Sequence, residues 1–230
     1  MNFLSHAIRL LGILGLTGIV AACASAPVSK DYSVFRSENP RSILVVPALN
    51  NTLNVSAPDF FLSTISRPFA ERGYYVFPAH MVKRVMEDDG LGDPGLVHNA
   101  DAARFSRLFG CDSALFVTIQ QWDSKYLLLA TQTTVRFDYA LKSCKTGASL
   151  WQDSQQMVYS PQANSGGGNP IATLIAQAVM AAIEKGAPNY MPLTIQANAQ
   201  AAGVQGQGLP AGPYLVGYGK DTTVFLSGSK

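Results

Sequence analysis

The stretch SILVVPALNNTLNVSAPDFFLSTISRPFAERGYYVFP, residues 42–78, has the pattern of a strand, a helix and a second strand. Residues 42–47 form a continuous apolar run of the kind that buried strands show. Pro58 suits the first turn of a helix and Gly73 suits its end. One face of this helix is apolar and carries Phe61, Leu62, Ile65 and Phe69. Residues 74–78, rich in aromatic side chains, predict the second strand, so the stretch is a parallel βαβ unit.

The sequence after this unit predicts more helices and then an antiparallel meander. Helices are expected over residues 80–88 and 100–109, with a loop over residues 90–99. Three strands follow, over residues 114–121, 126–141 and 149–159, with turns near Asp123–Ser124 and at residues 145–147. A meander after a βαβ unit gives a mixed sheet with flanking helices. We therefore predict a single domain of the α/β (α+β) class.

Composition divides the chain into four segments: a leader (1–22), a tether (23–40), the mixed α/β domain (41–186) and a C-terminal extension (187–230). The extension is rich in Gln, Ala and Gly, so we expect it to be exposed or loosely packed, with residues 222–226 suited to an edge strand. Without the leader the chain has 16 Lys and Arg against 15 Asp and Glu. A net charge so close to zero argues against a nucleic-acid partner.

The leader has the layout of a secretory signal. It contains one basic residue, Arg9, and an apolar run over residues 10–22, which as a helix is about 20 Å long and too short to cross a hydrocarbon core of roughly 30 Å. The sequence Val20-Ala21-Ala22-Cys23 at its end resembles the lipobox of bacterial lipoproteins. We predict cleavage before Cys23 and lipidation of its thiol. Ordinary signal cleavage and a buried cysteine are the alternatives.

The residues that follow the lipobox also indicate which of the two bacterial membranes the lipid would enter. Lipoproteins retained in the inner membrane carry Asp after the lipidated cysteine, whereas here Ala24 and Ser25 follow Cys23. The resemblance therefore implies the outer membrane, with the domain facing the periplasm. Two or three acyl chains hold a protein at a bilayer essentially permanently.

Two further cysteines, Cys111 and Cys144, have positions that suit a disulfide. Cys111 lies just before the strand expected at residues 114–121, and Cys144 lies just after its expected antiparallel partner. The start of the first strand then lies beside the end of the second, and an oxidising compartment favours pairing. No CxxC motif is present, so we predict a structural bond. Two buried free thiols are the alternative.

The sequence offers little that resembles catalytic chemistry. His80 and His98 lie on separate elements, and no metal-binding spacing, nucleophile motif or cofactor loop is present, so we expect no catalytic residue, metal site or cofactor. The acidic residues Asp88, Asp89 and Asp93 suit a solvated loop, and the glycines 166–168 suit a hinge. Trp122 and Trp151 lie on predicted strands, where core packing and a ligand platform both remain open.

Residues 171–183 predict a strongly patterned helix. Its apolar stripe suits packing against the sheet, while the small residues on its other side leave open a contact with another helix or a second subunit.

Three segments together resemble a known family. They are residues 67–78 (RPFAERGYYVFP), 47–52 (PALNNT) and 109–115 (FGCDSAL). They are similar to bacterial outer-membrane lipoproteins of unknown function, a family that includes a meningococcal lipoprotein vaccine antigen. The similarity extends from the lipobox to about residue 185. Cys111 and Cys144 depart from the family pattern, and their joint presence fits a disulfide.

The resemblance implies a fold similar to the N-terminal domain of TolB and, more distantly, to the curli-secretion lipoprotein CsgG. It also implies homodimers or a larger envelope complex, and it supplies no catalytic residues. Two functions follow as hypotheses: a non-enzymatic structural or accessory component of an envelope assembly or transport system, and a periplasmic module that binds a small molecule or glycan near Trp122 or Trp151.

Overall fold

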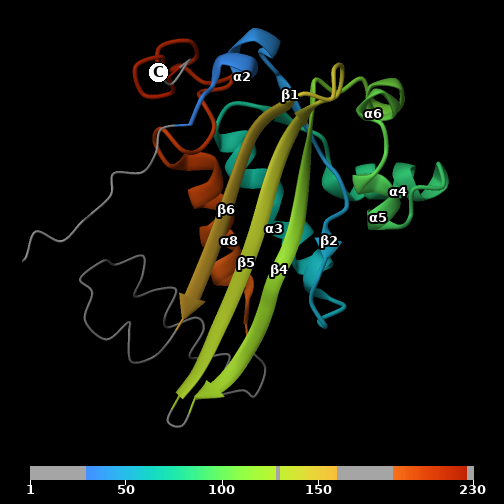
Figure 1. Ribbon diagram of the computed structural model, residues 1–230, viewed down its shortest axis with the longest axis vertical. Helices are drawn as coiled ribbons and strands as arrows, with labels where there is room; N and C mark the ends of the chain where they lie inside the picture. The colour runs from blue at the N-terminus through green and yellow to red at the C-terminus, as the bar shows by residue number, and fades with distance from the viewer. Residues whose placement is uncertain (1–29, 128–129, 160–188, 227–230) are drawn as a thin grey trace, which may run out of the picture.

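A computed structural model describes residues 30–127, 130–159 and 189–226 and contains one mixed sheet (Figure 1). Its strands are β1 (Ser42–Val45), β2 (Leu49–Asn50), β3 (Tyr75–Val76), β4 (Ser113–Leu127), β5 (Ala130–Ser143) and β6 (Ser149–Tyr159). The order is β3-β1-β4-β5-β6, and β2 pairs with β4. Strand β1 is parallel to β3 and β4, whereas β4, β5 and β6 are antiparallel. The predicted βαβ unit and the single α/β domain are confirmed.

Helices pack on both faces of the sheet, but over different strands. The helices are α2 (Ser33–Glu38), α3 (Ala57–Glu71), α4 (Ala79–Asp88), α5 (Pro94–His98), α6 (Ala102–Phe109) and α8 (Met191–Gly203). Helices α3 and α8 pack on one face, and α4, α5 and α6 pack on the other face beside β1 and the start of β4. Next to these three helices, β5 and β6 show an open face, toward the viewer in Figure 1.

The alternation of side chains in β1 explains the two layers of core. Ile43 and Val45 point into the larger cluster under α3 and α8. Leu44 points into the smaller cluster under α4, α5 and α6. All three side chains are buried. Helices lie on both faces of β1, and for this reason its sequence is a continuous apolar run.

The hairpin of β4 and β5 is longer than the sequence predicts. No turn occurs at Asp123–Ser124, because these residues pair with Thr134 and Thr133 within the ladder. The hydroxyl groups of Ser124 and Thr133 are 2.8 Å apart. Such cross-strand pairs stabilise polar residues within a strand. The predicted turn was therefore misplaced, because it rested only on residue types that are common in turns. The segment expected as a loop at residues 90–99 also contains α5.

Much of the C-terminal segment is part of the core, so the expectation of an exposed extension is wrong for residues 191–212 and for Phe225, whereas most of residues 214–224 are exposed. Helix α8 buries Ala197, Ala201 and Ala202, whose small side chains allow close packing against β6 and α3. The expected edge strand at residues 222–226 is also wrong: these residues form turns, and Phe225 packs edge-on against Tyr32 at 5.1 Å. Composition misled here because alanine suits a packed helix as well as an exposed tail.

The expected tether also contains structure, since α2 lies within it and buries Phe35. Cys111 and Cys144 form a disulfide in the smaller core cluster, with Cα atoms 6.0 Å apart. The leader, Cys23, the glycines 166–168 and the helix predicted at residues 171–183 lie outside the described residues.

Candidate functional site

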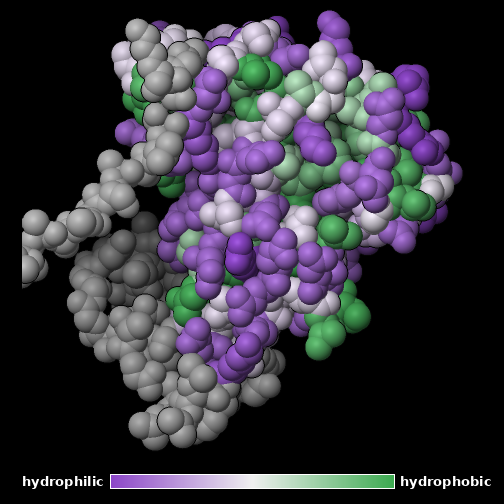
Figure 2. Space-filling view, viewed as in Figure 1, coloured by the Kyte–Doolittle hydropathy of each residue, from purple (hydrophilic) through white to green (hydrophobic). Residues whose placement is uncertain are grey.

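The open face of the sheet carries polar side chains from β4, β5 and β6. Residues alternate along β5, so Phe137 and Tyr139 are buried under α3 and α8 while Arg136 and Asp138 lie on the open face. Figure 2 shows this face as mostly hydrophilic. An apolar group projects beside it, where Figure 1 places the loop after β2; this loop exposes Leu53 fully.

A row of hydrogen-bonded side chains crosses the open face. The amide of Asn51 donates to Gln120 Oε1 at 3.2 Å, and Gln120 Nε2 donates to Asp138 Oδ2 at 2.7 Å. Ser154 Oγ donates to the other carboxylate oxygen of Asp138, also at 2.7 Å. We call these four residues the polar row. Each side chain is held by its neighbour, so the row presents a fixed pattern of polar atoms from the residue after β2 to β6.

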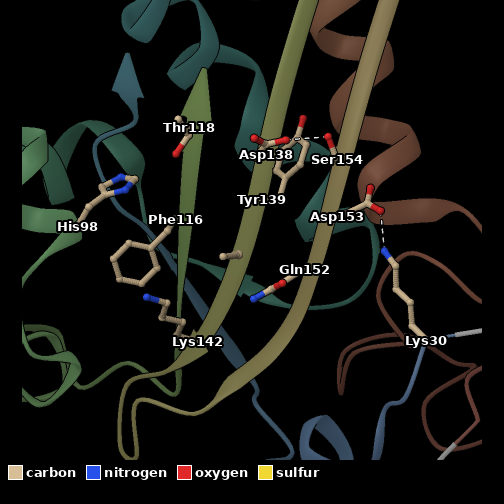
Figure 3. Close-up of a pocket in the computed structure, with 11 residues that line it drawn as sticks. Lys30, His98, Phe116, Thr118, Asp138, Tyr139, Lys142, Gln152, Asp153 and Ser154 are labelled. Atoms are coloured by element: carbon tan, nitrogen blue, oxygen red, sulfur yellow. Dashed lines mark hydrogen bonds and ion pairs between the residues drawn. The ribbon is translucent and has the colours of Figure 1, made fainter. Parts of the chain in front are cut away.

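A shallow hollow of about 570 Å³ lies along one side of this row (Figure 3). Helix α5 places His98 at its wall, where the ring meets Phe116 edge-on at 5.3 Å and Nε2 lies 3.1 Å from the carbonyl oxygen of Pro47. A carbonyl oxygen only accepts, so Nε2 carries the proton and Nδ1 is an acceptor. Burial lowers the pKa of His98, which favours the neutral ring.

The hollow has groups for binding and no arrangement for nucleophilic catalysis. Lys142 places its ammonium 4.8 Å from the ring centre of Phe116. Ser154 donates its proton to Asp138, and His98 bonds a backbone carbonyl. In the described parts of the chain, no hydrogen bond joins a histidine to a nucleophile, and no three His, Cys, Asp or Glu side chains gather to hold a metal. The side chains of this hollow are therefore suited to hydrogen bonding with a polar partner.

A second hollow, of about 510 Å³, lies at the other end of the row beside Trp122. Its lining includes Asn51, Asn54 and Tyr190. Trp122 is only 3% exposed and stacks on Tyr190 at 4.8 Å. Its indole nitrogen is buried and has no hydrogen-bond partner among the described residues.

Trp151 lies in the core on the covered face, where its indole nitrogen donates to the backbone of Gln207 at 2.8 Å. Core packing is therefore the correct interpretation of both tryptophans, and neither presents an open ring face as a platform.

The other residues singled out in the sequence have structural roles. Asp93 caps α5 by accepting from the backbone of Gly95, and Asp89 pairs with Arg104 at 2.5 Å. His80 is exposed on α4, and nothing brings it to His98. Sequence reasoning missed the polar row, although the alternation of Asp138 with the apolar residues Phe137 and Tyr139 was a signal for one polar sheet face.

None of the helices in the described residues is both long and apolar enough to span a bilayer.

Comparison with known proteins gives consistent results. Residues 30–214 match the family described as "Putative lipoprotein GNA1162-like". The chain is 34% identical over 146 residues to the "Putative lipoprotein NMB1124/NMB1162" of Neisseria meningitidis serogroup B, covering 62% of this chain and 67% of the relative. The crystal structure of lipoprotein GNA1162 from Neisseria meningitidis superposes with a TM-score of 0.53 at 28% identity, over 64% of this chain and 99% of that one.

A weaker structural match is the PelC dodecamer from Paraburkholderia phytofirmans, with a TM-score of 0.39, 16% identity, and coverage of 68% of this chain and 89% of that one.

Proposed function

The chain belongs to the GNA1162-like family of lipoproteins, and from this premise we propose that it is a lipid-anchored, non-enzymatic accessory component of an envelope assembly or transport system. The lipid is attached to Cys23 after removal of residues 1–22. The domain is held beneath the outer membrane and faces the periplasm, and its open sheet face is the surface offered to partners.

The observation that carries this proposal is the way in which the chain enters the domain. Lys30 pairs with Asp153 at 2.5 Å and donates to the backbone of Gln207 at 2.8 Å. Two residues later, the backbone of Tyr32 donates to Leu226 at 3.0 Å. Lys30 is seven positions after Cys23, a span of at most about 25 Å at 3.3–3.6 Å per residue. A lipid on Cys23 therefore holds the domain close to the bilayer.

The polar row supports an accessory role. Asp138 is occupied by Gln120 and Ser154, so its carboxylate is fixed as an acceptor. A rigid, mostly polar sheet face of this kind fits a protein interface that is formed and released, because such interfaces are about as polar as the rest of a protein surface. A homodimer or a larger envelope complex is the partner we propose, with no nucleic acid.

The test of the anchor is fractionation of cells that express the full chain. Wild-type protein is expected in the membrane fraction, with acyl chains on the N-terminal peptide by mass spectrometry. Cys23→Ser is expected to be folded and released into the periplasm, while Ser25→Ala, the matched control, stays with the membrane. Persistent membrane association of Cys23→Ser contradicts the anchor. Ala24→Asp tests the choice of membrane, because it is expected to shift the protein to the inner-membrane fraction.

Partners are tested by crosslinking in intact cells followed by mass spectrometry. A reproducible protein partner, or a crosslink between two copies, is the expected outcome. A monomer without any partner contradicts the accessory role, whatever the result for the anchor.

One observation favours a second function, the binding of a small polar molecule or glycan. The hollow beside Trp122 is lined by amide and hydroxyl side chains, and amides and hydroxyls are the groups that hydrogen-bond sugars and similar ligands. Native mass spectrometry of protein purified without denaturant tests it. A bound molecule that is lost in Asn54→Ala favours this function, and a protein that carries only its lipid argues against it.

A further inference from the structure

We propose that a second surface of the domain touches the bilayer that holds the anchor: the loop of residues 212–219, GPYLVGYG, here called the tyrosine loop. The inference rests on the proposed lipid on Cys23. It goes further by stating how the domain is oriented: the tyrosine loop lies against the lipid headgroups, and the loop after β2 faces away.

The tyrosine loop displays apolar and aromatic side chains to solvent. Val216 is 90% exposed and Tyr214 is 65% exposed, and Leu215 and Tyr218 are also exposed. No residue of the loop carries a charge. Tyrosine suits the boundary between lipid and water, because its ring is apolar and its hydroxyl is polar.

Backbone contacts hold the loop in place. The backbone of Gly212 donates to Arg72 at 2.7 Å, and that of Tyr214 donates to Gly73 at 3.0 Å. The hydroxyl of Tyr218 donates to the side chain of Asn39 at 2.8 Å. The side chains are therefore presented by a fixed loop, and little conformational freedom is lost when they meet another surface.

The tyrosine loop lies at the end of the molecule where the chain enters. Asn39, which Tyr218 contacts, ends α2, and α2 begins three residues after Lys30. A six-residue helix is about 9 Å long, so the loop lies well within the reach of about 25 Å that the seven positions back to Cys23 allow. Figure 1 shows α2 and the C-terminal segment together at this end, far from the loop after β2.

The loop after β2 gives a matched control. It displays Leu53, which is 102% exposed, and it is held by its own hydrogen bonds, such as Thr52 N to Asn50 Oδ1 at 3.1 Å. Both loops thus present an exposed aliphatic residue on a fixed backbone, at distant places on one domain. The two loops do not differ in having an exposed aliphatic side chain, but they differ in their distance from the point where the chain enters the domain.

The experiment places one environment-sensitive fluorophore on each loop of the full, lipidated protein. Val216→Cys and Leu53→Cys each introduce a single free thiol, because Cys111 and Cys144 form a disulfide and Cys23 carries the lipid in the proposal. Tyr214→Cys is a second labelling position on the tyrosine loop. Each labelled protein is reconstituted into vesicles of phosphatidylethanolamine and phosphatidylglycerol, with and without lipids brominated near the headgroup.

Labels at positions 216 and 214 are expected to shift to the blue and to lose emission with brominated lipid, while the label at position 53 shows neither change. The same result is expected in uncharged phosphatidylcholine vesicles, because the loop carries no charge. Equal quenching at positions 216 and 53, no quenching at 216 and 214, or quenching at 53 alone overturns the inference although the protein remains on the vesicles. Protein that does not float with the vesicles contradicts the proposed lipid on Cys23, and it also overturns the inference, which depends on that lipid.

Discussion

Gln120 and Asp138 join the two long strands β4 and β5 through a side-chain hydrogen bond of 2.7 Å on the open face of the sheet. Asp138 also accepts from Ser154 on β6, so one carboxylate connects three strands. The atoms involved are accessible to water, and their mutual bonds add little to stability. Their fixed arrangement therefore matters more for recognition than for folding.

The first prediction is that Asp138→Ala weakens partner binding with little loss of stability. The free energy of unfolding is expected to fall by about 1 kcal/mol or less, because the groups left behind are free to bond water. The yield of crosslinked partner in cells is expected to fall clearly. Arg136→Ala is the control: Arg136 is exposed on the same face of β5 outside the polar row, and its loss is expected to matter less. Equal yields from both variants contradict a role for the polar row.

The second prediction concerns the disulfide. Closing a chain over the 33 positions between Cys111 and Cys144 stabilises the fold by about 3–4 kcal/mol in the chain-entropy estimate. The double variant Cys111→Ala, Cys144→Ala is expected to lose that much in urea unfolding. Protein exported by the cell is expected to react with an alkylating reagent at neither cysteine until reductant is added. Two reactive thiols in exported, denatured protein contradict the bond.

The third prediction tests the place of α8 in the core. Asn198, fully buried, accepts from the Tyr139 hydroxyl at 2.7 Å and donates to Thr64 Oγ1 at 2.9 Å, so it connects β5 with α3. Asn198→Ala leaves a buried hydroxyl without its partner and is expected to cost about 2–4 kcal/mol in urea unfolding. Gln196→Ala, two residues away and partly exposed, is the control, with a change of about 0.5 kcal/mol or less. Equal effects contradict the network.

The sequence predicted the elements whose pattern is local. The apolar run at residues 42–47 and the one-sided helix after it determine the βαβ unit, and glycines with positive φ follow the predicted helices at Gly73 (φ +84) and Gly110 (φ +64). These features depend on periodicity and on backbone conformation, which neighbouring residues specify.

The features missed by the sequence depend on residues far apart in the chain. Lys30 and Tyr32 look like part of a polar tether in the sequence, but in the structure residues 207–226 contact both of them. Nothing near Asp138 in the sequence indicates that Gln120 and Ser154 meet it from neighbouring strands. Composition gives the polarity of each segment, but it does not give the partner that each segment packs against.

The fourth prediction tests the close approach that fixes the tyrosine loop. A Cβ atom on Gly212 would overlap the carbonyl group of Gly73, whereas one on Gly217 would meet only Ala211 Cβ, at 3.8 Å. Gly212→Ala is therefore expected to lower the free energy of unfolding by about 1–3 kcal/mol, as overpacking does. Gly217→Ala, five residues along the same loop, is expected to be neutral or slightly stabilising. Equal stability of the two variants contradicts the fixed loop.

The fifth prediction is a loss of stability in alkali that arises from buried tyrosines. Burial raises the pKa of Tyr32, Tyr74 and Tyr139, which keeps their phenols neutral in the folded state. In the unfolded chain they ionise near pH 10, so the unfolded state loses protons first and stability falls as the pH rises above about 10. The free energy of unfolding in urea is expected to be constant up to about pH 9 and to fall by at most about 1.4 kcal/mol per tyrosine for each pH unit beyond about pH 10. A flat profile to about pH 11, or full ionisation of these phenols near pH 10 in the folded protein by ultraviolet absorbance, contradicts the assignment.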